Sequence, residues 1–308
     1  MSSKLRPSGS LKKQLHSSDG CIIYAEATGN PLSPHVVLLH GMTLSGAVFD
    51  EFCQQQVLLH ELYIPITPEA HTSKLYADDF IAVVHGFDLK RPVSVGWRVF
   101  LLSILNAAHI HSRSIRGLVL CDILEHVHPP PISGIVYLAA TPTIAQFFAG
   151  SATPRLLSII SASSDPEQRP SVLRDFVDVC FVSDRGTAVP YTMRCTIAGM
   201  GALQPPEVPH SAFGRAQDPA RRWAAVEACL PVRMLYGTGD AVMVGPEAER
   251  EVRRHATDVE VTVLEGFGHM VWWEAPAEIA NAMVAFSRKM WRVLARALEF
   301  GVIIYSLA

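Results

Sequence analysis

Short apolar runs alternate with amphipathic stretches along most of this chain. Runs of four to nine apolar residues bounded by turn residues are typical of buried β-strands. Such runs occupy residues 21–29, 35–41, 92–95, 134–140 and 231–237. Two further strands are predicted at 62–64, which Pro65 should end, and at 259–266, where apolar and polar residues alternate.

The stretches between these strands carry apolar residues at helical spacing. In residues 72–87, for example, Phe80, Val83 and Val84 would share one helix face. The same period predicts helices over 47–61, 117–128 and 275–298. Strands that alternate with helices favour an α/β fold, with a mostly parallel central sheet flanked by helices on both faces.

One long segment interrupts the alternation. Residues 143–225 contain helical patterns and proline-rich joints but no clear strand, which indicates a helical cap inserted over one edge of the sheet. The polar N-terminus lacks strand or helix signals and is expected to be a flexible tail. The predicted organisation is a tail at 1–19, an α/β core at 20–142 and 226–290, a cap at 143–225, and a C-terminal helix extension or tail at 291–308.

Composition narrows the range of functions. Apolar residues make up 49% of the chain, and 26 basic against 29 acidic residues leave a net charge of -3. No basic patch or acidic tail stands out, so we expect a small or apolar ligand and no nucleic-acid partner. No G-x-G-x-x-G sequence opens a βαβ unit and no metal-ligand cluster appears, so no cofactor or metal is predicted.

The six cysteines are scattered and form no C-x-x-C pair, which is typical of reduced residues in an intracellular protein. The N-terminus has no apolar stretch like that of a secretory signal, and the most apolar runs are far shorter than the ~20 residues that span a bilayer. We therefore expect a cytoplasmic protein without a membrane span.

Three predicted strand ends carry residues that could do chemistry. His40-Gly41-Met42 follows the strand at 35–41, Asp240 follows that at 231–237, and His269 follows that at 259–266. Each has an ordinary structural interpretation, as a tight strand exit, a turn aspartate and a structural histidine respectively. Because the carboxyl ends of parallel strands meet at one edge, however, the three could also form one site.

Taken together, these motifs resemble the α/β-hydrolase superfamily, specifically its single-domain members with a helical cap, over roughly residues 20–290. The resemblance implies that Met42 contributes an oxyanion N–H, that Asp240 is the acid and that His269 is the base. The order of acid then histidine is also that of the family. Asp240 and His269 are therefore expected within hydrogen-bond reach at the carboxyl edge of the sheet.

The position of the nucleophile departs from this family pattern. Members carry G-x-S-x-G after the strand at 92–95. Here Gly96 and Trp97 fit, but Arg98 stands at the nucleophile position, and a protonated guanidinium cannot attack a carbonyl. Ser114 begins a stretch that resembles what should follow the turn: without residues 98–113 the chain would read G-W-S-I-R-G.

Two hypotheses account for the interrupted elbow. In the first, residues near 98–116 are translated from an unremoved intron and a coding piece is missing between Ile64 and Pro65. In the second, the chain is a diverged pseudoenzyme that uses the fold to bind a ligand. The resemblance implies a serine-type hydrolase of carboxylic esters or similar small acyl substrates, impaired or inactive as written. No Asp occupies the elbow, so the aspartate-nucleophile branch of the superfamily is disfavoured.

Overall fold

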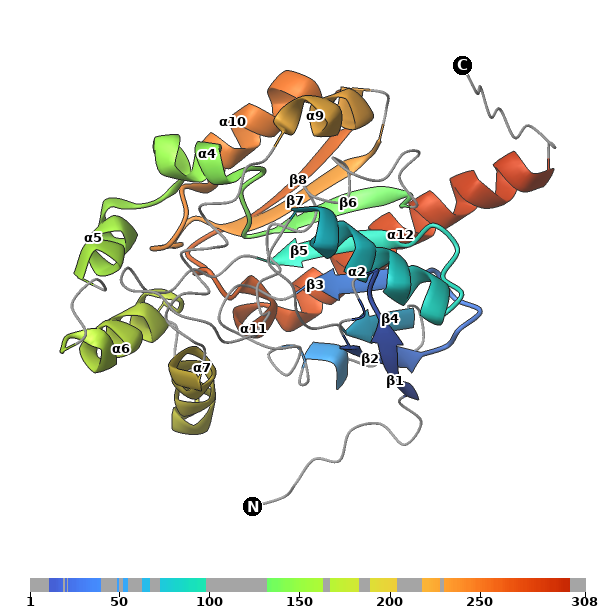
Figure 1. The fold of residues 1–308 in the computed structure, drawn as a ribbon. Helices are drawn as coiled ribbons and strands as arrows, with labels where there is room; N and C mark the ends of the chain where they lie inside the picture. The colour runs from blue at the N-terminus through green and yellow to red at the C-terminus, as the bar shows by residue number, and fades with distance from the viewer. Residues whose placement is uncertain are drawn as a thin grey trace.

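The described residues form an eight-stranded sheet in the order β1-β2-β4-β3-β5-β6-β7-β8 (Figure 1). The computed structural model describes residues 11–18, 20, 22–39, 49, 52–54, 63–66, 73–97, 132–162, 167–182, 189–203, 218–227 and 230–299. The strands are β1 (Leu11–His16), β2 (Ile22–Gly29), β3 (Val36–Leu39), β4 (Tyr63–Ile66), β5 (Val93–Trp97), β6 (Gly134–Leu138), β7 (Val232–Gly237) and β8 (Val259–Leu264).

Strands β4, β3, β5, β6, β7 and β8 pair in parallel, whereas β1–β2 and β2–β4 are antiparallel. Every residue of β3 and of β6 is buried, as expected for parallel strands covered on both faces. The predicted mostly parallel sheet is therefore confirmed, and the carboxyl ends of β3, β5, β6, β7 and β8 lie along one edge.

The helices lie on both sides of this sheet (Figure 1). They are η2 (Phe52–Gln54), α2 (Ser73–Gly86), α4 (Ile144–Gln146), the π-helix η3 (Phe147–Ser151), α5 (Pro154–Ala162), α6 (Arg169–Val179), α7 (Tyr191–Leu203), α9 (Pro219–Glu227), α10 (Gly245–His255), α11 (Val271–Glu274) and α12 (Pro276–Glu299). The helices predicted over 72–87 and 275–298 are confirmed as α2 and α12. Of the helix predicted over 47–61, only Phe49 and η2 are described, and 117–128 lies outside the described residues.

The longest helix, α12, forms because its apolar residues recur every three or four positions. The buried members of this stripe are Ile279, Ala280, Met283, Val284, Phe286 and Met290. The stripe packs against β6, where a Cβ added to Gly134 would lie 3.0 Å from the Phe286 ring. Glycine at the start of β6 therefore allows helix and sheet to approach closely.

The expectation of a flexible tail through residue 19 is wrong for residues 11–16, which form the edge strand β1 paired with β2. Alternation explains the strand, since Lys13 and Leu15 are half-buried while their neighbours are exposed. A Cβ on Gly86 would lie 2.5 Å from Leu15, so the strand packs tightly on the end of α2. The Lys13 ammonium donates to the Gly86 carbonyl and lies 4.8 Å from the centroid of the Phe87 ring.

The prediction that a strand breaks off at Pro65 is also wrong, because β4 continues to Ile66. Pro65 pairs with Ala27 of β2, while the ladder between β4 and β3 includes only Ile66 and Leu38. A proline is tolerated where pairing on one side is this limited, because its missing N–H removes few ladder bonds. A missing coding piece after Ile64 remains a hypothesis.

The described part of residues 143–225 holds α4, η3, α5, α6, α7 and α9, with no strand of the sheet and one isolated bridge between Ala152 and Met243. Helices α5, α6 and α7 contact one another in sequence and gather on one side of the molecule (Figure 1). Their role as a cap, and the boundaries of the other parts, remain predictions.

Helix α12 continues into the segment expected to be a C-terminal extension. None of the helices described is both long and apolar enough to cross a membrane.

Candidate functional site

The two adjacent strands β7 and β8 each deliver one polar side chain to the same edge of the sheet. Gly237 at the end of β7 pairs with Leu264 at the end of β8, so the loops that follow begin side by side. In these loops the Nδ1 atom of His269 lies 2.8 Å from Oδ2 of Asp240. Each side chain is only 1% exposed. The predicted proximity of Asp240 and His269 at the carboxyl edge is confirmed.

The Asp240 carboxylate is held in place by its own loop. Its Oδ1 accepts hydrogen bonds from the backbone N–H groups of Val242, at 2.7 Å, and Met243, at 2.9 Å. These bonds leave Oδ2 directed at His269. A carboxylate is only an acceptor, so it favours the tautomer in which Nδ1 carries the proton and Nε2 carries the lone pair. In this arrangement Nε2 can take a proton from a nucleophile.

Glycines allow the two loops to approach this closely. A Cβ added to Gly237 would lie only 2.0 Å from the carbonyl oxygen of Phe267, so any side chain there would collide with the histidine loop. The next glycine, Gly239, donates its N–H to the same Phe267 carbonyl at 2.9 Å. Gly266 has φ +71°, a conformation that glycine adopts without strain. The sequence signal "GTGD" and "GFGH" thus has a direct steric cause.

The histidine loop is also bonded to the chain segment after α6. The carbonyl oxygen of Cys180 accepts the backbone N–H of His269 at 3.2 Å and that of Met270 at 3.1 Å. The backbone of His269 is therefore fixed from one side while its ring is fixed from the other by Asp240. A segment of the predicted cap, residues 180–182, thereby contacts the candidate site.

A second, half-buried acid lies at the site and was not foreseen from the sequence. Glu274, the last residue of α11, accepts the Val182 N–H on Oε1 at 2.7 Å and the Gly268 N–H on Oε2. The Glu274 side chain thus connects residues 180–182 with the histidine loop, as the Cys180 carbonyl also does. The signal available in the sequence is a single acid within the apolar stretch "VWWEAP", five residues after His269.

Burial governs the electrostatics of this region. Desolvation raises the pKa of the Glu274 carboxyl, the N–H groups of Val182 and Gly268 oppose the rise, and the charge of Asp240 adds to it. Desolvation also raises the pKa of the Cys180 thiol well above its usual value, with the nearby carboxylates of Asp240 and Glu274 acting in the same direction. Burial therefore disfavours the thiolate of Cys180, which is the form that acts as a nucleophile.

The remaining predicted site residues are only partly described. Gly96 is buried in β5 between Leu39 and Tyr137, and the backbone of Trp97 ends the strand beside β6. Strand β5 thus ends at the same sheet edge as the loops that carry Asp240 and His269. His40, Gly41, Met42, Arg98 and Ser114 lie outside the described residues, so the oxyanion and nucleophile assignments remain predictions.

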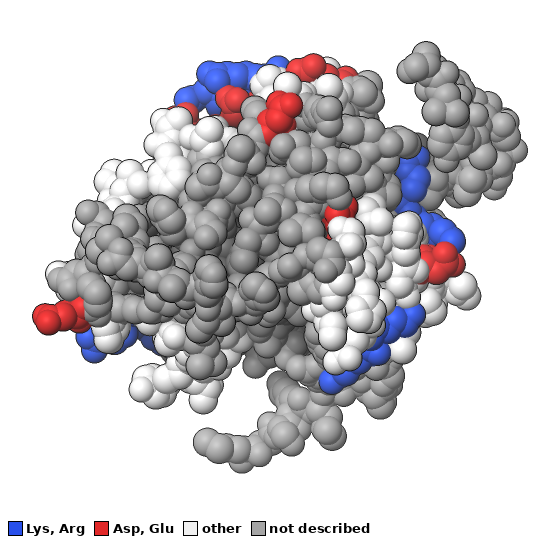
Figure 2. Space-filling view, in the orientation of Figure 1, with Lys and Arg blue, Asp and Glu red and all other residues white. Residues whose placement is uncertain are grey.

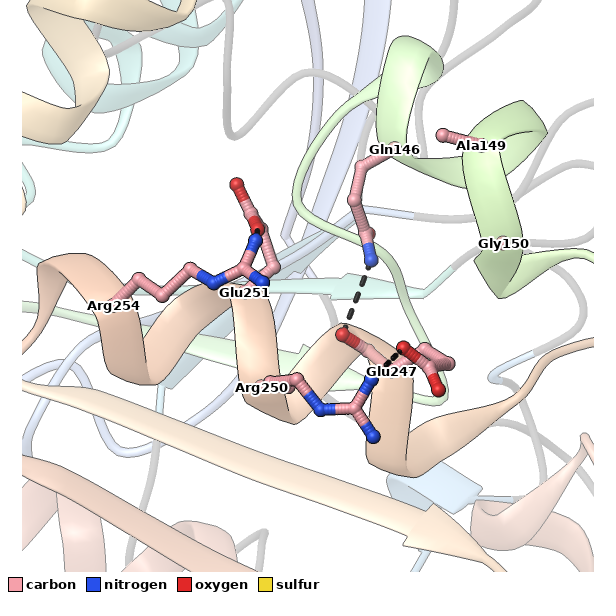
Figure 3. A pocket seen from close by; sticks show the side chains of 7 residues that line it. All are labelled: Gln146, Ala149, Gly150, Glu247, Arg250, Glu251 and Arg254. Atoms are coloured by element: carbon pink, nitrogen blue, oxygen red, sulfur yellow. Dashed lines mark hydrogen bonds and ion pairs between the residues drawn. The ribbon is translucent and has the colours of Figure 1, made fainter.

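A separate surface pocket lies between α4, η3 and α10 (Figure 3) and is lined by Gln146, Ala149, Gly150, Glu247, Arg250, Glu251 and Arg254. Its charges are paired internally: Arg250 with Glu247, and Arg254 with Glu251 at 2.6 Å. Neither His269 nor Asp240 lines it. On the face shown in Figure 2, basic (blue) and acidic (red) side chains lie next to one another over α10 and do not form a patch of one sign.

The described residues contain no group of three or more His, Cys, Asp or Glu side chains that could hold a metal ion.

No family model and no curated protein matches the sequence. The structure, by contrast, is similar to a putative aryl esterase from Burkholderia cenocepacia, with a TM-score of 0.73 and 18% identity over 92% of this chain and 100% of that one. It is also similar to the esterase RhEst1 from Rhodococcus sp. ECU1013, with a TM-score of 0.72 and 20% identity over 91% and 99% of the two chains.

A bromoperoxidase from Bacillus anthracis has a TM-score of 0.66 at 17% identity, over 90% of this chain and 100% of that one. Sequence identities this low establish a common fold and leave the activity open. The shared architecture agrees with the mostly parallel sheet. The chain has the α/β-hydrolase fold.

Proposed function

We propose that this chain is a serine-type hydrolase scaffold for carboxylic esters or similar small acyl substrates. The observation that carries the proposal is the buried pair of His269 and Asp240, 2.8 Å apart at the carboxyl edge of the sheet. A solvent-excluded carboxylate on the far side of an imidazole is the arrangement that orients a general base and stabilises its protonated form.

In this proposal Ser114 is the nucleophile and the Met42 N–H is an oxyanion donor. His269 Nε2 takes the hydroxyl proton as Ser114 Oγ bonds to the ester carbonyl carbon, and the carbonyl oxygen becomes an oxyanion. The protonated imidazole then gives that proton to the departing alcohol as the C–O bond breaks. Water, deprotonated by His269, hydrolyses the acyl-enzyme in the same way and frees the acid.

The neighbours in structure support an ester substrate, because two of those named above are esterases. The bromoperoxidase shows that the fold alone does not determine the substrate. We also propose a cytoplasmic location, because Cys53, Cys180 and Cys195 are free thiols, as is usual in a reducing compartment.

Arg98 at the elbow leads us to propose that the chain as written is impaired. Loss of a triad nucleophile typically lowers kcat by ~10⁴-fold or more, leaving the residual effect of binding and oxyanion stabilisation. The same residue favours a second candidate function, a non-catalytic ligand-binding protein, in which the pocket is retained and the chemistry lost. Turnover of an ester distinguishes the two.

The test is hydrolysis of 4-nitrophenyl acetate by the chain as written and by a repaired chain, defined as one lacking residues 98–113, carrying Arg116→Gly and given a loop after Ile64. We expect slow turnover by the former and a much faster rate from the latter. The repaired rate should be lost in Ser114→Ala and His269→Ala but kept in His85→Ala, which removes an exposed histidine of α2.

Two results would overturn this account. A repaired rate that survives His269→Ala would exclude this histidine as the base. Strong activity of the unmodified chain that is lost in His269→Ala but survives Ser114→Ala would mean that another residue is the nucleophile. A folded repaired chain with no turnover would instead support the ligand-binding alternative.

A further inference from the structure

Four hydrogen bonds hold residues 268–274 against residues 180–182, almost ninety positions earlier in the sequence, and three of the four cross between the two segments. Two of them run from the N–H groups of His269 and Met270 to the Cys180 carbonyl. The other two run from the N–H groups of Val182 and Gly268 to the carboxylate of Glu274. The histidine loop is therefore attached to the segment after α6 through one carbonyl and one side chain.

From this geometry we propose that Glu274 is a positioning residue for His269, coupling the ring's place at the site to the segment at residues 180–182. The inference rests on the proposed function, in which His269 is the base. Glu274 acts through Gly268, the residue directly before His269, and through Val182 of the predicted cap.

The chemistry of the contact calls for a carboxylate. Two separate N–H donors reach its two oxygens, so each oxygen must be an acceptor. A glutamine presents one acceptor and one amide group, and its amide would face an N–H donor and repel it. The contact is also tight at Gly268, where a Cβ would lie 3.1 Å from both Glu274 Oε1 and the Val182 nitrogen.

Burial and neighbouring charges also act on the Glu274 carboxylate. Burial raises the pKa of Glu274 most strongly, and the charge of His269 is among the influences that lower it. Glu274 and Asp240 are thus two carboxylates close to one imidazole. Asp240 holds the ring through Nδ1, while Glu274 holds the backbone from which the ring projects. Loss of Glu274 should therefore loosen the Nδ1–H contact to Asp240 even though that contact is not itself removed.

The experiment follows the His269 Nδ1–H proton by NMR in the full-length chain, which needs no catalysis. An imidazole N–H bonded to a buried carboxylate gives a downfield signal that exchanges slowly with water, and His269→Ala assigns it. We expect Glu274→Gln to speed its exchange at least tenfold, on the scale expected when a buried hydrogen bond opens more readily, and Glu274→Ala to abolish the signal.

Two control variants separate positioning from general stability. Glu278→Gln removes an exposed acid from the first turn of α12 and should leave the signal unchanged. Val252→Ala weakens the core under α10 and should lower the unfolding midpoint without selective loss of the signal. The proposal fails if the proton exchanges at the original rate in Glu274→Gln, or if Val252→Ala accelerates it equally. If the expected exchange pattern is found and a folded repaired chain still shows no turnover, the result counts against the proposed function and not against the positioning role of Glu274.

Discussion

Adding a methyl group at Gly237 should displace the histidine loop without altering any polar residue. The new Cβ would lie 2.0 Å from the Phe267 oxygen, whereas real Cβ atoms essentially never come closer than 3.0 Å to a neighbour. The backbone at Phe267 must therefore retreat by about 1 Å, a shift that overpacked sites make at a typical cost of ~1–3 kcal/mol. The bond from Gly239 N–H to that same oxygen would be stretched or lost, at a further cost of about 1 kcal/mol.

The free energy of unfolding of Gly237→Ala should thus fall by roughly 2–4 kcal/mol, the sum of these two contributions. Gly199→Ala is the matched control, since it adds the same methyl group in the middle of α7 where nothing lies within 4 Å. That control should be stabilised by about 0.5–1 kcal/mol, because alanine is the better helix former.

Urea unfolding followed by circular dichroism measures both variants, and the His269 Nδ1–H signal reports on the site. The free energy of unfolding should fall in Gly237→Ala and rise in Gly199→Ala. The His269 Nδ1–H signal should be kept only in Gly199→Ala. If Gly237→Ala unfolds within about 0.5 kcal/mol of the unmodified chain, as a typical surface substitution does, the close approach of the two loops is not what the structure describes.

Further predictions concern the same region. Iodoacetamide at pH 8 should modify the exposed Cys195 but not Cys180, whose pKa burial raises; peptide mass spectrometry that finds Cys180 modified in the native protein would contradict this. Because the folded-state pKa of Glu274 is raised, the stability that it contributes is present at acid pH and is lost as the pH rises through that pKa. The stability difference between the unmodified chain and Glu274→Gln should therefore shift in favour of Glu274→Gln as the pH rises, and urea titrations that find the opposite slope would refute the assignment. In an active, repaired chain Asp240→Asn should lower kcat by about 10⁴-fold through the wrong imidazole tautomer, and an unchanged rate would exclude Asp240 as the orienting acid.

The parallel sheet and the pair of Asp240 and His269 could be predicted because their signals are local and repeated. Buried strands of a parallel sheet are nearly continuous apolar runs, and the loops at their carboxyl ends meet at one edge wherever the strands run in parallel. In the structure, Gly237 allows the backbones of these two loops to approach closely.

The features that were missed depend on tertiary contacts. The strand β1 has only two leucines, and it is held by its pairing with β2 and by the packing of Leu15 against Gly86. The continuation of β4 past Pro65 depends on how few bonds it makes to β3. Glu274 was missed because its partners, Val182 and Gly268, are backbone groups, which carry no side-chain signature in a sequence.

The most direct test of the central claim is labelling with a fluorophosphonate probe, which reacts with activated serines, followed by peptide mass spectrometry. The account predicts that the repaired chain is labelled at Ser114 and that His269→Ala prevents the labelling, because the buried base is what activates the serine. The chain as written should react weakly or not at all. A folded repaired chain that stays unlabelled, or labelling of any serine that persists in His269→Ala, would contradict the claim that His269 and Asp240 serve a serine hydrolase.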